Sequence, residues 1–180
     1  MIRVLVSTAS RHGATTQIGE QLGSALRKAL DGRGLDADVD IRGAESIGAG
    51  TDVGRYDAAV IGSAVYFGRW LRPARRLIAQ HDADLKSMPV WLFSSGPIGE
   101  EGSTVGPPPA PDWVREHKTF GGKVDPQALR WHERLIVKVL RVADTDSRDA
   151  AAITRWADQI AAQLVDAVPQ PLSDHSVQDL

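Results

Sequence analysis

The chain has 180 residues, and its 21 lysine and arginine residues nearly balance its 23 aspartate and glutamate residues. This length predicts one domain with a sizeable core, and the near balance of charge disfavours a nucleic-acid-binding protein. Because cysteine is absent, disulfides, thiolate metal sites and a cysteine nucleophile are excluded, and we expect no metal centre. No apolar run approaches the ~20 residues that a membrane span needs, and no signal peptide is expected. We therefore expect a cytoplasmic protein.

The first predicted element is a strand that leads through a small turn into a helix. Residues 2–6 are apolar apart from Arg3, and residues 18–30 carry leucine and isoleucine at helical spacing. The turn between them combines hydroxyl side chains, one glycine and two basic or polar residues, within Ser10, Arg11, His12, Gly13, Ala14, Thr15 and Thr16. Free N–H groups and the helix dipole favour an anion there, and the glycine permits a tight bend. This turn is therefore a candidate phosphate-binding loop.

Two further strands and a helix are predicted next. Residues 36–41 alternate between apolar and acidic side chains, which is typical of an edge or half-exposed strand. Residues 43–54 are expected to form a loop with a short helix. Residues 56–63 and 90–94 are uniformly apolar, as buried parallel strands are. Between them, Pro73 and the apolar spacing after it predict a helix.

A glycine- and proline-rich stretch separates the last predicted strand from these elements. Residues 96–111 are expected to form an extended surface loop. A short helix is predicted to start at Trp113 and Val114. Residues 118–123 predict the last strand, shortened or bulged at its glycines.

The C-terminal part of the chain predicts two helices and a tail. Apolar residues at helical spacing occur over 129–142 and most clearly over 149–168. We expect one domain over residues 1–168 and a disordered polar tail over 169–180. Because strands and helices alternate throughout, the expected fold is α/β, with a doubly wound five-stranded parallel sheet and helices on both faces. Ligands of such folds bind at the carboxyl ends of the strands.

The sequence lacks two phosphate-binding motifs, and their absence narrows the range of ligands that the candidate phosphate loop could bind. It contains neither G-x-x-x-x-G-K-[ST], the nucleoside-triphosphate loop, nor G-x-G-x-x-G, the dinucleotide fingerprint. Residues 10–15 resemble the [ST]-x-[ST]-G-x-[ST] loop of the flavodoxins, although His12 stands where the family usually has a hydroxyl. The resemblance implies that the phosphate of FMN is bound by Ser10, Arg11, His12, Gly13, Ala14 and Thr15.

Two later turns resemble the parts of flavodoxins that lie against the isoalloxazine ring. Residues 63–68 correspond to a T-P-T-Y-x-G-like loop, apart from the alanine and valine, and an aromatic side chain there can stack on the flavin. Alternatively, the aromatic residues of this turn anchor the helix that follows. Residues 94–99 form a small turn whose backbone N–H groups are expected to be free to meet the pyrimidine edge. The resemblance implies ring contacts by Ala64, Val65, Tyr66, Phe67, Gly68, Ser94, Ser95, Gly96 and Pro97.

A narrower resemblance covers nearly the whole chain. Segments 9–15, 62–66, 93–97, 117–123 and 148–157 look like the bacterial flavodoxin-domain proteins related to menaquinone-dependent protoporphyrinogen oxidase. This similarity implies a flavodoxin-like fold, one bound FMN and a redox role.

Three functions are compatible with this resemblance. The first is an FMN-dependent oxidoreductase, protoporphyrinogen oxidase-like or quinone reductase-like, which passes electrons between an organic substrate, such as a porphyrinogen, and a quinone. The second is an electron carrier between protein partners, and the third is a binding module that has lost FMN. Carriers are typically acidic and cover both faces of the flavin, so the near-neutral charge and a third turn without aromatics favour the enzyme. The retained glycine and hydroxyls disfavour the third function.

The remaining candidates concern histidines and a basic helix. We name no catalytic acid or base, and we expect His117 and His132 at the surface. Residues 127–142 predict a basic amphipathic helix. Such a helix either lies on an anionic membrane surface, where a quinone would be found, or packs its apolar stripe on the sheet, which is the commoner case. The expected partners are thus a small-molecule redox substrate or quinone and, through this helix, a weak peripheral contact with the inner membrane face.

Overall fold

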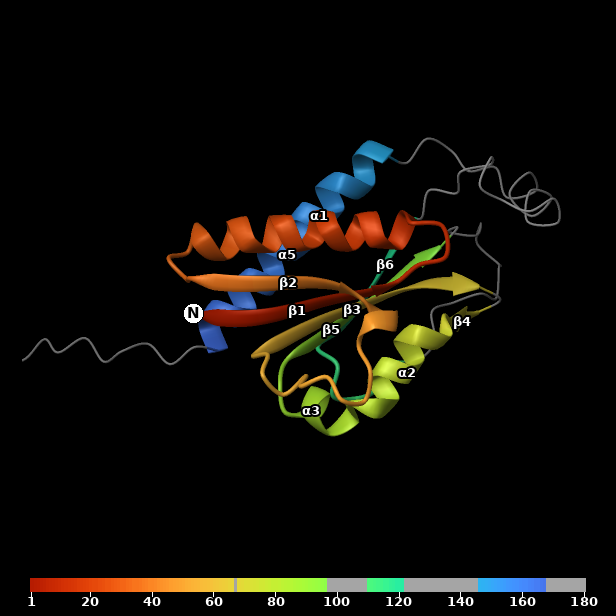
Figure 1. Ribbon diagram of the computed structural model, residues 1–180. Helices are drawn as coiled ribbons and strands as arrows, with labels where there is room; N and C mark the ends of the chain where they lie inside the picture. The colour runs from red at the N-terminus through yellow and green to blue at the C-terminus, as the bar shows by residue number, and fades with distance from the viewer. Residues whose placement is uncertain (67, 97–109, 122–145, 168–180) are drawn as a thin grey trace, which may run out of the picture.

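Strands and helices alternate along the chain in the computed structural model (Figure 1). The structure describes residues 1–66, 68–96, 110–121 and 146–167. The elements, in chain order, are β1 (Ile2–Ala9), α1 (Ala14–Asp31), β2 (Ala37–Gly43), the 3-10 turn η1 (Ala44–Ser46), β3 (Ala58–Tyr66), β4 (Arg69–Trp70), α2 (Arg72–Gln80), α3 (Asp82–Lys86), β5 (Val90–Gly96), β6 (Glu116–Gly121) and α5 (Asp146–Ala167).

A parallel sheet in the order β2-β1-β3-β5-β6 forms the centre of the molecule, and the short strand β4 pairs antiparallel with β3. This arrangement confirms the predicted doubly wound parallel sheet. From β1 the chain crosses to β2 on one side, and it later returns to β3 on the other side of β1. The strand order therefore reverses between β1 and β3. Ligands of doubly wound sheets bind at this switch point, outside the carboxyl ends of the strands.

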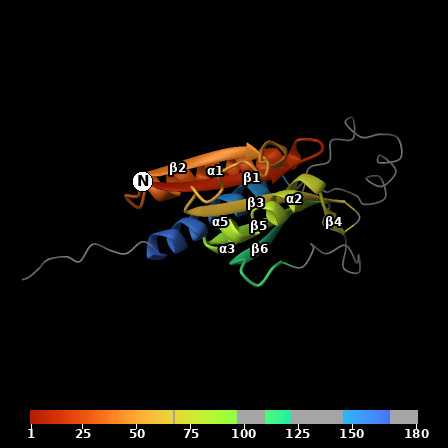
Figure 2. The ribbon, with the colours of Figure 1, turned by 60° about the horizontal axis from the view of Figure 1, so that its bottom comes forward.

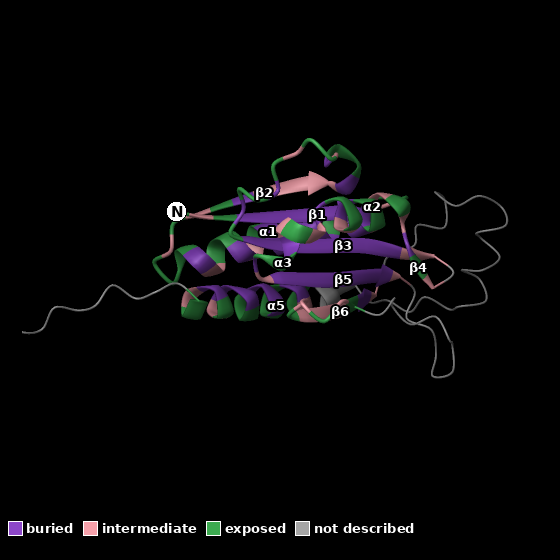
Figure 3. Cartoon of the chain, turned by 90° about the horizontal axis from the view of Figure 1, so that it is seen from below, coloured by how far each residue is buried: buried purple, intermediate pink, exposed green. Residues whose placement is uncertain are grey.

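Two apolar cores lie on the two faces of the sheet. α1 and α5 cover one face, whereas α2, α3 and η1 cover the other (Figures 1 and 3). The strands β1, β3 and β5 are buried along most of their length, which explains why their sequences are mostly apolar. Eight of the predicted inward-facing residues of the two long helices are buried, namely Ile18, Leu22, Leu26, Leu30, Ile153, Trp156, Ile160 and Leu164. The ninth, Val168, lies outside the described residues.

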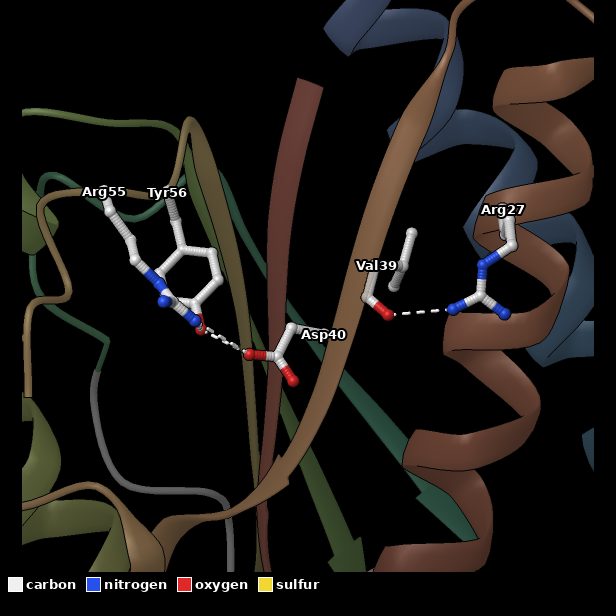
Figure 4. Close-up of polar contacts among 5 residues, drawn as sticks. All are labelled: Arg27, Val39, Asp40, Arg55 and Tyr56. Atoms are coloured by element: carbon white, nitrogen blue, oxygen red, sulfur yellow. Dashed lines mark hydrogen bonds and ion pairs between the residues drawn. The ribbon is translucent and has the colours of Figure 1, made fainter. Parts of the chain in front are cut away.

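The edge strand β2 is held by polar contacts from two directions (Figure 4). Arg27 of α1 donates from Nη2 to the backbone carbonyl of Val39 at 2.8 Å. From the other direction, the hydroxyl of Tyr56 donates to Oδ2 of Asp40 at 2.5 Å, and Nη2 of Arg55 donates to the Tyr56 oxygen at 2.9 Å. Side-chain contacts of this kind leave less of an edge open to pairing with another strand. The predicted half-exposed edge strand is confirmed.

Two strands continue further than the sequence predicts. β3 runs to Tyr66 and β5 runs to Gly96, so residues expected in the following turns belong to the sheet. The reason is that each extension finds a partner in a neighbouring strand, as Ala64 does opposite Ser95. The last strand, β6, begins at Glu116, two residues before the predicted start.

The prediction of a short helix at Trp113 and Val114 is wrong. These residues lie in a turn in which the N–H of Val114 donates to the carbonyl of Pro111 at 3.0 Å. The N–H of Arg115 already donates to the carbonyl of Val90 at 2.8 Å, so the chain joins the sheet before a helix can form. The short helix α3, in contrast, was not predicted.

Three predictions lie outside the described residues: most of the loop over 96–111, the basic helix over 127–142, and the disordered tail over 169–180. They stay predictions. Within the described part of the chain, no helix is both long enough and apolar enough to cross a membrane.

Candidate functional site

The carboxyl ends of β1, β3 and β5 meet at one edge of the sheet. Ala9, Ser63, Ser94 and Thr119 pair in register and form one row across four strands. Beyond this row lie the loop after β1 and the ends of β3 and β5. Figures 1 and 2 show the start of α1 and the strand β4 at the same end of the sheet. The fold thus gathers the three segments that the sequence keeps apart.

The loop over residues 10–13 makes the tight bend that the sequence predicts. Gly13 has a φ of +85°, in the left-handed region that favours glycine. Its N–H donates to Oγ of Ser10 at 3.0 Å, and its carbonyl accepts from the N–H of Gln17 at 2.9 Å, which begins the helix. The loop and the first turn of α1 are therefore a single hydrogen-bonded unit.

The start of α1 fits an anion. No side chain caps it, and its first turn contains no acidic residue. The first N–H groups of a helix have no intrahelical partner, and the helix dipole places partial positive charge beside them. The space beside Gly13 is open, because no atom lies within 4 Å of the position that a Cβ would take. Backbone N–H groups next to open space are a common phosphate-binding arrangement.

The side chains of the loop differ in accessibility. Arg11 and His12 are exposed, Ser10 and Ala14 are half-buried, and Thr15 is only 1% exposed. The Ser10 hydroxyl accepts one hydrogen bond from the backbone and retains a proton that it can donate to a ligand. The predicted binding role thus fits Ser10 more directly than Thr15.

The end of β3 forms a hairpin with β4. Val65 pairs with Trp70 across the two strands, and Gly68, with a φ of +71°, lies in the turn between them. Val65 and Tyr66 are half-buried, and the guanidinium of Arg11 lies 4.9 Å from the centre of the Tyr66 ring. This cation–π contact joins the loop after β1 to the hairpin. The two predicted binding segments therefore touch.

The predicted turn after the third buried strand is corrected by the structure. Ser94, Ser95 and Gly96 belong to β5; Ser94 and Ser95 pair with strands on both sides, and Gly96 pairs with Gly121 of β6. The expectation of free backbone N–H groups at Ser94 and Ser95 is wrong, because ladders on both sides of a central strand use its backbone groups. Gly96 is the last residue of the strand and is half-buried. Phe67 and Pro97 lie outside the described residues.

A side-chain cluster behind the hairpin was not predicted from the sequence. Nε1 of Trp70 donates to Oγ of Ser94 at 2.8 Å, and Nε2 of His117 lies 2.9 Å from the same oxygen. The rings of Trp70 and His117 meet edge to face, with centroids 5.5 Å apart. His117, predicted at the surface rather than as a catalyst, is half-buried, whereas His132 lies outside the described residues. The strand alternation of β6 was the one available signal, and it does not reveal which partners lie across the sheet.

Burial lowers the pKa of His117, because the charged imidazolium is poorly solvated there. The neutral ring is therefore favoured at neutral pH. Among the described residues, no group of three or more histidine, cysteine, aspartate or glutamate side chains could hold a metal ion.

Comparison with known proteins assigns the fold. Among solved structures, the chain is similar to oxidised Flavodoxin 1 from Bacillus cereus, with a TM-score of 0.56 and 10% identity over 92% of this chain and 99% of that chain. It is also similar to a flavodoxin from the domain Archaea, with a TM-score of 0.51 and 13% identity over 91% of this chain and 99% of that chain. Identities this low establish the shared fold alone.

A larger protein shares the same fold in part. The flavodiiron core of Flv1 from Synechocystis sp. PCC6803 matches with a TM-score of 0.60 and 16% identity, over 93% of this chain but only 37% of that one. No curated protein sequence matches the chain. The sequence model of the flavodoxin domain, however, matches residues 5–151, which is most of the chain. The chain therefore belongs to the flavodoxin domain family.

Proposed function

We propose that this protein binds FMN at the β1/β3 switch point and uses it as an oxidoreductase. The observation that carries the proposal is the meeting of an uncapped helix start and a tyrosine-bearing hairpin at one edge of the sheet. One part suits a phosphate and the other suits a flat aromatic ring, and FMN contains both.

The residues of the loop after β1 fit the phosphate of FMN. The first N–H groups of α1 can donate to phosphate oxygens, and the hydroxyl of Ser10 can add another donor. Arg11 and His12 are exposed beside them, and a guanidinium favours the charge of a phosphate. Gly13 lets the backbone approach closely because no side chain fills the space. These residues define the phosphate side of the site.

The hairpin of β3 and β4 fits the isoalloxazine ring. The guanidinium of Arg11 packs against one face of the Tyr66 ring, and the opposite face can stack on a ring and exclude water from it. Residues 94–111, which follow from the end of β5, contain no aromatic residue. A ring bound against Tyr66 would therefore keep one face accessible to a small molecule. This hairpin, with the end of β5, defines the ring side of the site.

An open ring face suits an enzyme better than an electron carrier. Bound FMN supplies the electron-transfer chemistry, while the protein supplies binding, orientation and electrostatics. The formal net charge of −2 provides little long-range attraction for a basic protein partner. We propose a small organic electron donor, with a porphyrinogen as one candidate, and a quinone acceptor, as in the protoporphyrinogen oxidase-related proteins that the sequence resembles.

The first experiment tests the cofactor and its phosphate contact. Purified protein should retain a flavin absorbance spectrum after FMN is added and unbound FMN is removed, and a hundredfold excess of FMN over its Kd should stabilise the fold by about 2.7 kcal/mol. The double variant Ser10→Ala, Thr15→Ala should lose much more affinity for FMN than for riboflavin, because riboflavin lacks the phosphate. Thr154→Ala is a matched control, because it removes an exposed hydroxyl of α5 that donates to the carbonyl of Ala150 within the same helix. Equal losses for FMN and riboflavin would contradict the phosphate assignment.

The second experiment separates the enzyme from the carrier. Chemically reduced, FMN-loaded protein should be reoxidised rapidly by small quinones. If the reduced protein is not reoxidised by any quinone but quickly reduces a redox protein partner, the carrier function is established instead.

We propose, as a separate matter, that residues 127–142 contact an anionic membrane surface where the quinone resides. The basis is the basic, amphipathic sequence of this segment. Arg134→Glu with Lys138→Glu should abolish binding to anionic liposomes and leave the FMN content unchanged. Wild-type protein that floats with neither neutral nor anionic liposomes would exclude this contact.

A further inference from the structure

The cluster of Trp70, Ser94 and His117 links three strands just behind the ring side. Trp70 comes from β4, Ser94 from β5 and His117 from β6, and all three side chains meet on the face that α2 covers. Ser94 is 1% exposed and Trp70 is 4% exposed, so their contacts are shielded from water. Hydrogen bonds shielded in this way restrict side-chain position more strongly than exposed ones.

The direction of the hydrogen bonds follows from the donors available. The indole N–H of Trp70 can only donate, so Ser94 Oγ must accept from it. The hydroxyl of Ser94 keeps one proton, and Nε2 of a neutral His117 can accept it at 2.9 Å. If Nε2 carried a proton instead, both neighbours would donate to Ser94, whose own proton would have no acceptor in this contact set. The arrangement that satisfies all three groups runs from Trp70 through Ser94 to His117.

The cluster controls the hairpin that bears Tyr66. Trp70 pairs with Val65, the residue that precedes Tyr66 in β3. Immediately after Trp70, the N–H of Leu71 donates to Oγ of Ser63 at 3.0 Å. The returning strand of the hairpin is therefore held by one serine from β3 and one from β5. Of these two contacts, the one through Ser94 depends on a further side chain, His117.

The position of His117 beside Ser94 is explained neither by a catalytic serine nor by an ion pair. A serine beside a histidine can serve as a nucleophile, but Ser94 is buried and its oxygen already accepts the Trp70 proton. The charged neighbours of His117 on β6 point to the opposite face, where Glu116 accepts from Nε1 of Trp156 at 2.8 Å. Lys118 lies 3.7 Å from the same glutamate. His117 thus faces the hairpin cluster rather than a charged partner.

We propose that His117 is a positioning residue for the ring side of the flavin site: through Ser94 it orients Trp70, and so sets the hairpin that presents Tyr66 to the ring. This role rests on the proposed FMN binding. If His117 has this role, a substitution of His117 should alter the binding of the flavin ring and leave the phosphate contact unchanged. FMN and riboflavin should therefore respond equally to a change at His117.

The test compares three variants of the full chain by titration with FMN and with riboflavin. In His117→Leu the side chain cannot accept the Ser94 proton. The affinities for FMN and for riboflavin should both fall by the same factor, about tenfold, which corresponds to the loss of one hydrogen bond. It should also alter the visible circular dichroism of the bound flavin, which reports the surroundings of the ring. His117→Gln places an amide oxygen near the position of Nε2 and should restore both the affinity and the spectrum. Ser94→Ala removes the link itself and should reproduce His117→Leu, so the test survives if one variant fails to fold.

A buried histidine at a distance from the site provides a control. His81 is 4% exposed and lies at the far end of α2, where its Nε2 donates to the carbonyl of Gly48 at 3.0 Å. His81→Leu should lose a comparable hydrogen bond and destabilise the fold without changing either flavin affinity. Equal weakening by His81→Leu and His117→Leu would overturn the proposal, because general destabilisation would then explain both.

The remaining outcomes separate this inference from the proposed function. Wild-type protein that binds neither flavin would overturn the proposed function and this role together. Wild-type protein that binds FMN while His117→Leu and Ser94→Ala bind it equally well would overturn the positioning role alone. A loss confined to FMN would also overturn it, since that result would assign His117 to the phosphate.

Discussion

The phosphate side and the ring side of the candidate site are built in different ways. The phosphate side consists of consecutive residues, 10–15, in which a strand, a left-handed glycine and a helix start follow one another. The ring side is assembled from β3, β4, β5 and β6, and His117 lies 51 positions after Tyr66 in the sequence. One side therefore depends on local chain geometry, and the other depends on contacts between distant strands.

This difference predicts how the two sides respond to mutation. A change in the loop after β1 should alter the contribution of the phosphate, which is measured by the ratio of FMN affinity to riboflavin affinity. A change in the hairpin or its supports should alter the affinity for riboflavin itself and leave that ratio unchanged. The four variants below test this separation, from the largest expected effect to the smallest.

Trp70→Ala should have the largest effect. The side chain is 4% exposed within the core under α2, and it holds the hairpin through Ser94. Loss of a buried tryptophan costs about 3–5 kcal/mol. Urea unfolding should show this loss, and riboflavin binding should fall steeply while the FMN-to-riboflavin ratio is preserved. A selective loss of FMN would contradict the separation of the two sides.

Gly62→Ala should affect both sides, because β3 pairs with β1, which leads into the phosphate side, and ends at Tyr66 of the ring side. A Cβ on Gly62 would lie 2.0 Å from Cζ of Phe93, whose buried ring packs against Phe120 and Trp156. Overpacking of this kind costs about 1–3 kcal/mol. Gly48→Ala is the matched control, since nothing lies within 4 Å of its Cβ position. Thermal unfolding that shows the same stability for both variants would contradict the packing argument.

Gly13→Ala should act on the phosphate side alone. The φ of +85° strains any L side chain, at about 1–2 kcal/mol, although no atom obstructs the new methyl group. FMN affinity should fall more than riboflavin affinity. Gly34→Ala imposes a similar strain beyond the other end of α1, at a φ of +74° and also in open space. It should cost similar stability in urea unfolding and leave both affinities unchanged.

The pH dependence of stability should show the smallest effect and reports on the ring side. Burial lowers the pKa of His117 below the ordinary value of 6.5, so between the folded pKa and 6.5 the unfolded chain binds more protons than the folded protein. This contribution to stability is complete above pH 6.5 and is lost as the pH falls toward the folded pKa. His117→Gln should remove this part of the slope when unfolding free energies are compared between about pH 8 and pH 5. A slope that is the same in wild type and variant would contradict a lowered pKa of the half-buried His117.

Some features of this protein follow from its sequence alone. The apolar stripes of α1 and α5, the alternation of β2 and the bend at Gly13 were all predicted and are confirmed. Each depends on the period of a single element or on the conformational preference of one residue, and both are properties of a short stretch of chain. The parallel sheet followed as well, because alternating strands and helices with right-handed crossovers allow few other arrangements.

Other features were decided only by the tertiary structure. The ends of β3 and β5 could not be located from the sequence, because a strand continues as long as neighbouring strands supply hydrogen-bond partners, and those partners come from elsewhere in the chain. The same reason explains why the surroundings of His117 could not be predicted from the sequence. Its neighbours in the sequence are charged and partly exposed, and its burial depends on Trp70 and Ser94, which reach it only when three strands lie side by side. The bend of the loop after β1 could therefore be predicted from consecutive residues, whereas the cluster behind the hairpin exists only in the folded sheet.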